Sequence, residues 1–350
     1  MTPQQRSEIG CAVAQRHRLY TSTTGKDHAD YTPEVGLGLS IIAAEELVTS
    51  LSKGQNQLFE AELINDAEER KLPSTRRGDA LLRFLMIDQT SLSAMMSTHE
   101  VHPSAELLLS KIAERQLFNS LAFQSGMQTF HWLRWIDTLN GCVVAVRKQS
   151  ASLNFKKLKI NFEDEAKQRF LTLKRLFHEQ LRAAKVAKHI HLDLIYTKSG
   201  VIGRTGVHCI LPKLQTDLNA LIEELKDTPA ENFLSAAWAI DCNSDLIYRV
   251  HLSILFSARQ PEEDCFHIVE NVRSAWHKIT KTGLVQHPEE NGSMQHRFGG
   301  TGIYQWDSSP SKSALDSVAY YMSMPETYLR LRLEPETKSW GITLRDSHPS

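Results

Sequence analysis

Tyr248-Arg249-Val250-His251-Leu252-Ser253-Ile254-Leu255-Phe256 is a run with the composition of a β-strand and a single histidine among mainly apolar residues. Successive side chains of a strand point to opposite faces, so Arg249, His251 and Ser253 share one face and the residues between them share the other. We therefore expect a sheet with one apolar face against a core. The other face is polar, and we expect a metal or a nucleic acid to reach His251 there.

A second stretch, His189 to Tyr196, alternates in the same way and puts His189, His191 and Asp193 on one face. Imidazole and carboxylate groups bind divalent metals, and this pattern predicts a weak metal site. If this strand pairs with the first, Asp193 and His251 approach each other across one face. The alternative is a polar strand face without a metal, in which the His-x-His pair lies exposed at the start of the strand and His251 is bonded to a neighbour.

The organisation of the chain indicates an α+β fold with more than one domain, as its length of 350 residues favours. From residue 189 the order is strand, helix, strand, strand, helix, helix and strand, which is typical of a split β-α-β plan with an antiparallel sheet and helices on one face. We divide the chain into a mainly helical domain of unknown role at 1–150, a basic connecting helix at 151–188 and the sheet domain at 189–350. Predicted helices cover 34–53, 57–71, 77–96, 104–123 and 162–188, with 130–146 as a helix or a helix running into a strand, 148–161 as a polar connection and 286–312 as loop.

The overall composition indicates an ordinary globular protein. A net charge of -1 is no global signature of nucleic-acid binding, so local basic patches have to carry any such function. The five dispersed cysteines are typical of reduced thiols in a cytosol-like compartment. No run approaches the roughly 18 apolar residues of a spanning helix, and no signal peptide is evident. We expect a soluble, cytoplasmic protein without a membrane partner.

Local basic residues are candidates for contacts with nucleic-acid phosphates. They are Arg175, Arg182 and Lys185 on the connecting helix, and Lys278 and Lys281 near the end of a later helix. The last two also suit the negative end of the helix dipole and need no ligand there.

The segment Tyr320-Tyr321-Met322-Ser323-Met324 is predicted to lie near the end of a short helix. A tyrosine beside a metal-held phosphate can act as a nucleophile and form a phosphotyrosine. An aromatic pair on a short helix is otherwise explained by packing into the core. Tyr321, with Tyr320 next to it, is therefore a catalytic candidate with a structural alternative.

From about His189 to Ser347 the chain resembles the inovirus gene-2-protein-like family, also called the YagK/YfjJ C-terminal domain family. Its members are replication proteins of filamentous phages and related prophage proteins. The order and spacing of the matching segments carry the resemblance more than any one of them. These segments are His191–Leu194, Ala237–Ile240 with Tyr248–Phe256, Ser274–Trp276 before Gly283, and Tyr320–Arg330 with Lys338–Thr343.

The resemblance implies a Rep-like, HUH-type palm that binds DNA and cuts one strand with a tyrosine and Mg²⁺ or Mn²⁺. Tyr321 would then be the nucleophile and His251 a metal ligand. Two departures from the family pattern affect this expectation: Arg249 stands where the family usually has histidine, and Met324 where it usually has lysine. A cation repels the metal, and the lost lysine removes a charge that steadies the phosphate. DNA binding can survive both changes, and Arg249 can itself contact a phosphate.

We therefore predict a DNA-binding protein of a phage-like or mobile element, related to rolling-circle replication initiators but without nicking activity. Whether it is an enzyme is left open. One alternative is an active metal-dependent DNA nickase that uses Tyr321 and takes its metal from the histidines and Asp193. Another is a non-catalytic interaction or assembly subunit on a palm fold. The partners expected are DNA and other proteins of the same mobile element.

Overall fold

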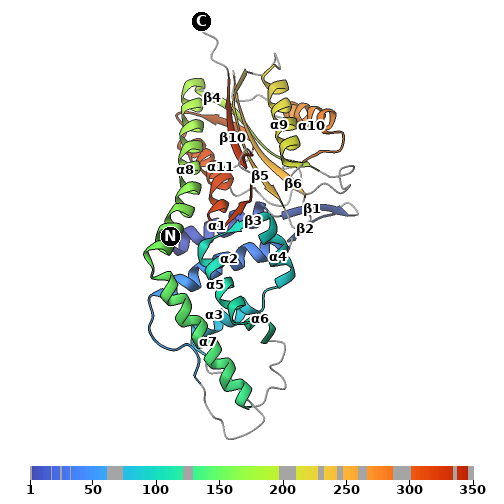
Figure 1. Cartoon of the computed structure of the whole chain (residues 1–350). Coiled ribbons are helices and arrows are strands. Elements are labelled where there is room, and N and C mark those ends of the chain that lie inside the picture. Colours follow the sequence, from blue (N-terminus) through green and yellow to red (C-terminus); the bar gives the residue numbers. More distant parts are fainter. Residues whose placement is uncertain are drawn as a thin grey trace. The chain divides into compact units, whose positions relative to one another are not determined.

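A computed structural model describes residues 2–16, 18–23, 26–31, 33–60, 74–120, 129–196, 210–227, 232–242, 247–258, 266–286, 301–333 and 337–345 (Figure 1). The chain divides into two compact units. Unit 1 holds residues 1–16, 31–165 and 327–330, and unit 2 holds 17–30, 166–326 and 331–350. The main division falls between Glu165 and Ala166, inside the helix α8 (Leu153–Ala184). Two short segments depart from this division, because 17–30 belongs to unit 2 and 327–330 belongs to unit 1.

Unit 1 is built around α2 (Pro33–Ser52), which packs against most of the other helices of this unit. Its apolar side chains Ile41, Val48 and Leu51 are buried on one side of the helix, while Ala43 and Glu46 on another side are exposed. The elements that surround it are α1 (Pro3–Arg16), α3 (Arg76–Leu85), α4 (Gln89–Thr98), α5 (Pro103–Glu114), α6 (Leu117–Ser120) and α7 (Thr129–Ser150), and a short sheet of β3 (His99–Val101) with β9 (Leu329–Leu331).

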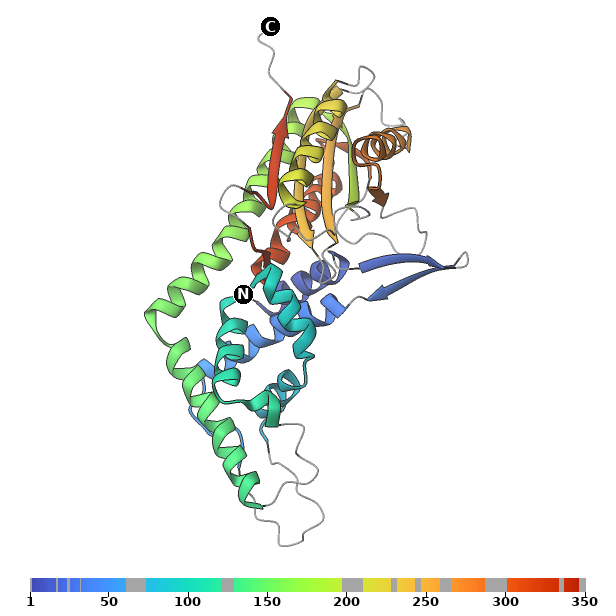
Figure 2. The ribbon, with the colours of Figure 1, turned by 45° about the vertical axis from the view of Figure 1, so that its right-hand side comes forward.

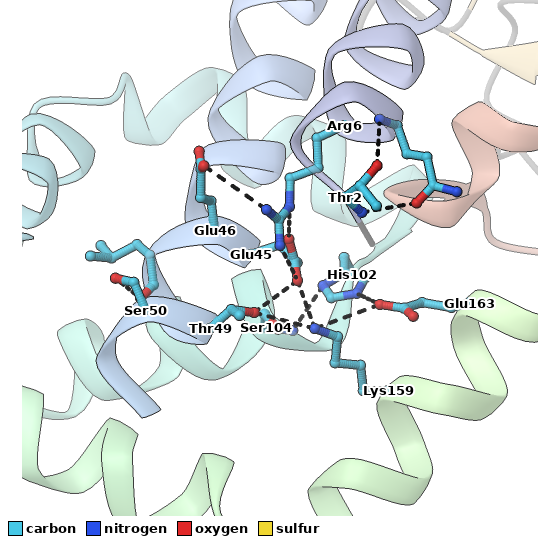
Figure 3. A network of polar contacts seen from close by, with 12 residues as sticks. Thr2, Arg6, Glu45, Glu46, Thr49, Ser50, His102, Ser104, Lys159 and Glu163 are labelled. Atoms are coloured by element: carbon cyan, nitrogen blue, oxygen red, sulfur yellow. Dashed lines mark hydrogen bonds and ion pairs between the residues drawn. The ribbon is translucent and has the colours of Figure 1, made fainter. Parts of the chain in front are cut away.

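A polar network crosses the interior of unit 1 (Figure 3). The buried Glu45 carboxylate accepts hydrogen bonds from Arg6 at 2.7 Å and from Lys159 at 2.6 Å, so cations from α1 and α8 neutralise it. His102 caps α5 by accepting from the Ser104 amide, and its other ring nitrogen lies 3.3 Å from Glu163. A buried charge is tolerated only when it is paired, and this network pairs Glu45 twice.

Unit 2 contains a six-stranded antiparallel sheet in the order β10-β5-β6-β4-β7, with β8 pairing with β4. Its strands are β4 (Val186–Tyr196), β5 (Asn232–Cys242), β6 (Tyr248–Ser257), β7 (Leu284–Gln286), β8 (Gly302–Gln305) and β10 (Trp340–Leu344). The predicted α+β class with an antiparallel sheet is confirmed. Two further strands, β1 (Arg18–Thr23) and β2 (Lys26–Tyr31), form a sheet of their own (Figure 2).

Helices cover both faces of this sheet, so the prediction of helices on one face is wrong. The apolar side chains of β4, β5 and β6 form one core with α9 (Ile210–Lys226) and α10 (Phe266–Thr280). On the other side lie α8 and α11 (Ser309–Ser323) (Figure 1). Ring contacts of Phe177 with His189 and of Tyr321 with His251 join these two helices to the polar side chains of the strands. The face expected to be open is therefore an interior.

Several predicted elements differ from the observed ones. The predicted helix 77–96 is two helices, because Asp88 accepts hydrogen bonds from the Thr90 and Ser91 amides and so starts α4. The predicted connection 148–161 is mostly helix, since α7 ends at Ser150 and α8 begins at Leu153. The stretch 130–146 lies wholly in a helix. The predicted loop 286–312 contains β8 and the start of α11. Outside the described residues lie 287–300 of that loop, 61–71 of the predicted helix 57–71 and 121–123 of the predicted helix 104–123.

No described helix combines the length and the apolar character that crossing a membrane requires.

Candidate functional site: a buried histidine–aspartate group beside Tyr321

The pairing of β4 with β6 positions the centre of the candidate site. In this antiparallel register Asp193 stands directly opposite His251, as expected if the two strands pair. The Asp193 carboxylate accepts a hydrogen bond from Nδ1 of His251 at 2.6 Å. Strand alternation sends both side chains to the same face, away from the apolar core with α9 and α10.

His191, two residues before Asp193 on the same strand, completes a group of three possible metal ligands. One ligand atom from each of His191, Asp193 and His251 lies within 4.8 Å of the others. All three side chains are buried, with His251 fully enclosed. The expected exposure of the His-x-His pair, and the expected access to His251, are therefore wrong. The cause is the layer of α8 and α11, which covers this face of the sheet.

Tyr321 on α11 closes the group from the opposite side. Its hydroxyl lies 3.3 Å from Nδ1 of His251, and its ring meets those of His191 and His251 edge to face, with centroids 5.4 and 5.3 Å apart. Tyr321 is only 1% exposed. Met324 ends α11, its amide donating to the Tyr320 carbonyl, and puts no charge beside Tyr321.

Arg249 lies beside the same carboxylate. One of its guanidinium nitrogens is 3.9 Å from Oδ2 of Asp193, and its side chain is largely buried. Burial alone would raise the pKa of Asp193, but the charge of His251, the hydrogen bond from it and the charges of Arg249 and His191 hold this pKa well below its usual range. Asp193 is thus an anion whose counter-charges come from the protein itself.

The donor set fits a transition metal better than Mg²⁺. Imidazoles suit ions such as Zn²⁺ and Fe²⁺, and the carboxylate also suits Mn²⁺, whereas Mg²⁺ prefers a set made of oxygen ligands. The spacing of the three ligand atoms allows one ion to contact them all. Arg249 opposes this, because its charge competes with a divalent cation for Asp193.

No known family, curated protein or solved structure matches this chain. The resemblance of residues 189–347 to the inovirus gene-2-protein-like family is therefore a prediction from the sequence.

Two predicted candidates lie outside the central group. His189 is buried and bonds to Ser253 through Nε2 at 2.7 Å, so it holds β4 to β6. Tyr320 points its ring at Phe170 of α8, with centroids 5.9 Å apart. Both side chains pack between elements of unit 2.

Arg249, one of the predicted phosphate contacts, is largely buried beside Asp193, and the others lie on two separate surfaces of unit 2. Arg175, Arg182 and Lys185 are exposed on α8 and just after its end. Lys278 on α10 pairs with Glu224 of α9 at 3.2 Å, and Lys281 is exposed in the turn after α10. Of these two predicted groups, the α8 group is the one that keeps several exposed cations along a single element.

Trp306 lies beside these cations of α8, and sequence reasoning missed it. Its amide donates to the Lys185 carbonyl at 2.8 Å, which fixes it beside the end of α8. With Arg175 and Arg182 it lines a shallow pocket of about 370 Å³, and Lys312 Nζ lies 4.0 Å from its ring centre. More than 120 positions separate Trp306 from Arg182, so no local pattern could have linked them.

Proposed function

We propose that this chain is a DNA-binding protein of a phage-like or mobile element, related to rolling-circle replication initiators and without nicking activity. The observation that carries the proposal is that the charge of Asp193 is already balanced within the protein, beside a buried Tyr321. His251 and Arg249 balance this charge, and the adjacent Tyr321 is 1% exposed. A Rep-like palm that has lost its chemistry accounts for both features.

The burial of Tyr321 disfavours strand cleavage. A tyrosine nucleophile has to bring its hydroxyl oxygen to the phosphorus atom of a strand, and near-attack geometry requires a separation of about 3 to 3.5 Å. Here the hydroxyl faces His251 inside unit 2. Arg249 adds a second obstacle, because it occupies the neighbourhood of the carboxylate that a metal would need.

The exposed cations of α8 support DNA binding. Arg175, Arg182 and Lys185 can contact phosphates of a strand that runs along the helix, and such contacts supply most of the sequence-independent affinity for DNA. Trp306 beside them offers an aromatic ring, on which a base of a single strand can stack. We call Arg175, Arg182, Lys185 and Trp306 the α8 surface.

Charge reversal on the α8 surface tests the proposal. The variant Arg175→Glu/Arg182→Glu should weaken binding of a labelled single-stranded oligonucleotide at least tenfold in fluorescence anisotropy, and should flatten the decline of affinity with salt. The matched control is Lys156→Glu/Lys157→Glu, which reverses two exposed cations earlier on the same helix. Equal losses in both variants, or no DNA binding by the unaltered chain, would reject the α8 surface.

A second candidate function, metal-dependent nicking, is favoured by the convergence of His191, Asp193 and His251 beside Tyr321. A metal bound there would supply positive charge to a scissile phosphate. This candidate predicts cleavage of a single-stranded oligonucleotide with Mn²⁺, a covalent protein–DNA adduct, and loss of both in Tyr321→Phe. Absence of cleavage and adduct under conditions where the DNA is bound removes this candidate.

A further inference from the structure

A groove in unit 1 has the size of a small-molecule site. It has a volume of about 690 Å³ and lies between α2 and α3. Ligand pockets are typically about 300 to 1,000 Å³, with a mainly apolar lining and a few placed polar groups. Leu47 and Phe84 contribute apolar atoms to the groove, and the small side chains of Ala43 and Ala80 leave room above them.

Three arginines make this groove cationic. Arg76, Arg77 and Arg83 all line it from α3. Positions 76 and 83 are two helical turns apart and therefore lie on the same face. Among the described residues none of the three pairs with a carboxylate. Arg83 is four residues from Asp79 but donates to its backbone carbonyl at 3.4 Å, while the Asp79 carboxylate bonds to the Ser74 hydroxyl.

Two features of this placement disfavour the cations electrostatically. Arg76 and Arg77 stand in the first turn of α3, after the N-cap Thr75, where the positive end of the helix dipole disfavours a cation. Arg77 also lies close to Arg147: burial lowers the pKa of Arg147, and the charge of Arg77 lowers it further. An anion bound among the arginines would relieve both repulsions.

We propose that this groove binds a nucleoside phosphate, with Arg76, Arg77 and Arg83 around the phosphate and the apolar floor of Leu47 and Phe84 beneath the base. Guanidinium groups match phosphate oxygens in two-pronged geometry, which explains three arginines in place of lysines. Glu46, which also lines the groove, can accept a hydrogen bond from a sugar hydroxyl or a base amino group. The nucleotide is either free or part of a strand, and the α8 surface plays no role in this site.

Calorimetric titration of the full chain with ATP, inorganic phosphate and a 12-nucleotide single strand tests the proposal. Arg76→Ala/Arg83→Ala should weaken ATP binding at least tenfold. Ala43→Trp, which fills the groove at an exposed helix position without changing charge, should weaken it as much. Arg134→Ala removes an exposed arginine of α7 that does not line the groove and should leave the affinity within twofold. Circular dichroism would confirm that each variant is folded.

The proposal would be overturned by the absence of saturable binding of both ATP and the strand, by unchanged affinity in Ala43→Trp, or by a loss in Arg134→Ala equal to that in the double variant. Inorganic phosphate binding as tightly as ATP would also overturn it, because the base would then contribute nothing. Groove-dependent binding of the strand but not of ATP identifies a nucleotide within DNA as the ligand, and the reverse identifies a free nucleotide. Repeating the strand titration in Arg175→Glu/Arg182→Glu separates this groove from the α8 surface.

Discussion

Asp193 on β4 and His251 on β6 face each other in the strand register and share a 2.6 Å hydrogen bond in the interior of unit 2. The pair is covered by Tyr321 of α11, whose hydroxyl lies 3.3 Å from the same histidine nitrogen. Arg249 adds a second positive group beside the carboxylate. Through these contacts the polar groups at the centre of unit 2 neutralise one another. They should therefore stabilise the fold without a metal, unlike the ligands of an open metal site.

Replacing Asp193 by asparagine should destabilise unit 2 by about 3 kcal/mol, because the buried His251 and Arg249 would lose the carboxylate beside them. Chemical denaturation followed by near-ultraviolet circular dichroism measures the change. Asp227→Asn, an exposed carboxylate after α9, is the matched control and should cost little. A loss below about 1 kcal/mol for Asp193→Asn would show that this carboxylate does not balance buried charge.

Arg249→His should raise the affinity for Mn²⁺ at least tenfold, because it removes a competing cation from Asp193 and adds an imidazole on the same face. Electron paramagnetic resonance of free Mn²⁺ measures binding directly. Arg182→His, which alters an exposed arginine of α8, should change nothing. If both variants bind Mn²⁺ equally, Arg249 is not what keeps a metal from the His191–Asp193–His251 group.

Unit 1 should lose stability in acid through Glu45. Burial alone would raise the pKa of this carboxyl, but hydrogen bonds and charge from Arg6 and Lys159 lower it from 4.5 to about 2. Because the folded pKa lies below the unfolded one, the stabilisation is fully present above pH 4.5 and declines as the pH falls toward 2. It amounts to about 3 kcal/mol at neutral pH. Urea unfolding at several pH values should show that the free energy of unfolding falls in acid for the unaltered chain. The Glu45→Gln variant should lack this fall. The exposed Glu46→Gln should keep it.

Gly341 should tolerate no side chain. It stands opposite Trp238 in the pairing of β10 with β5, and a Cβ atom there would lie 2.4 Å from the tryptophan ring. Gly341→Ala should therefore displace this indole and destabilise unit 2 by about 1–3 kcal/mol. Thermal unfolding followed by tryptophan fluorescence measures both effects. Gly302→Ala in β8, where nothing lies within 4 Å of the added carbon, is the control; equal losses in the two variants would contradict the account.

Period-two alternation was sufficient to predict β4 and β6 and the approach of Asp193 to His251. Such a pattern indicates which side chains of a strand share a face, and antiparallel pairing then places the side chains of the neighbouring strand beside them on that face. It does not record what covers that face. The burial of His251 depends on α11, which begins more than 50 residues later. The expected exposure of His251 was therefore wrong because a distant part of the chain covers it.

Local sequence patterns also could not predict the shortest strand or the contacts between distant parts of the chain. The four residues of β8 carry no alternation long enough to stand out from a loop. The division between α3 and α4 depends on the capping side chain of Asp88, which is a local signal that could have been found. The arginines of the α2–α3 groove follow residues 61–73 in the chain, and only the fold places them opposite α2.

We infer that the chain binds DNA through the α8 surface and does not cut it. A single incubation with Mn²⁺ and a labelled single-stranded oligonucleotide tests this most directly, when the products are separated on a native and on a denaturing gel. We predict a shifted band on the native gel and intact, unlinked oligonucleotide on the denaturing gel. A covalent adduct that Tyr321→Phe abolishes, or the absence of any shifted band, would contradict the claim.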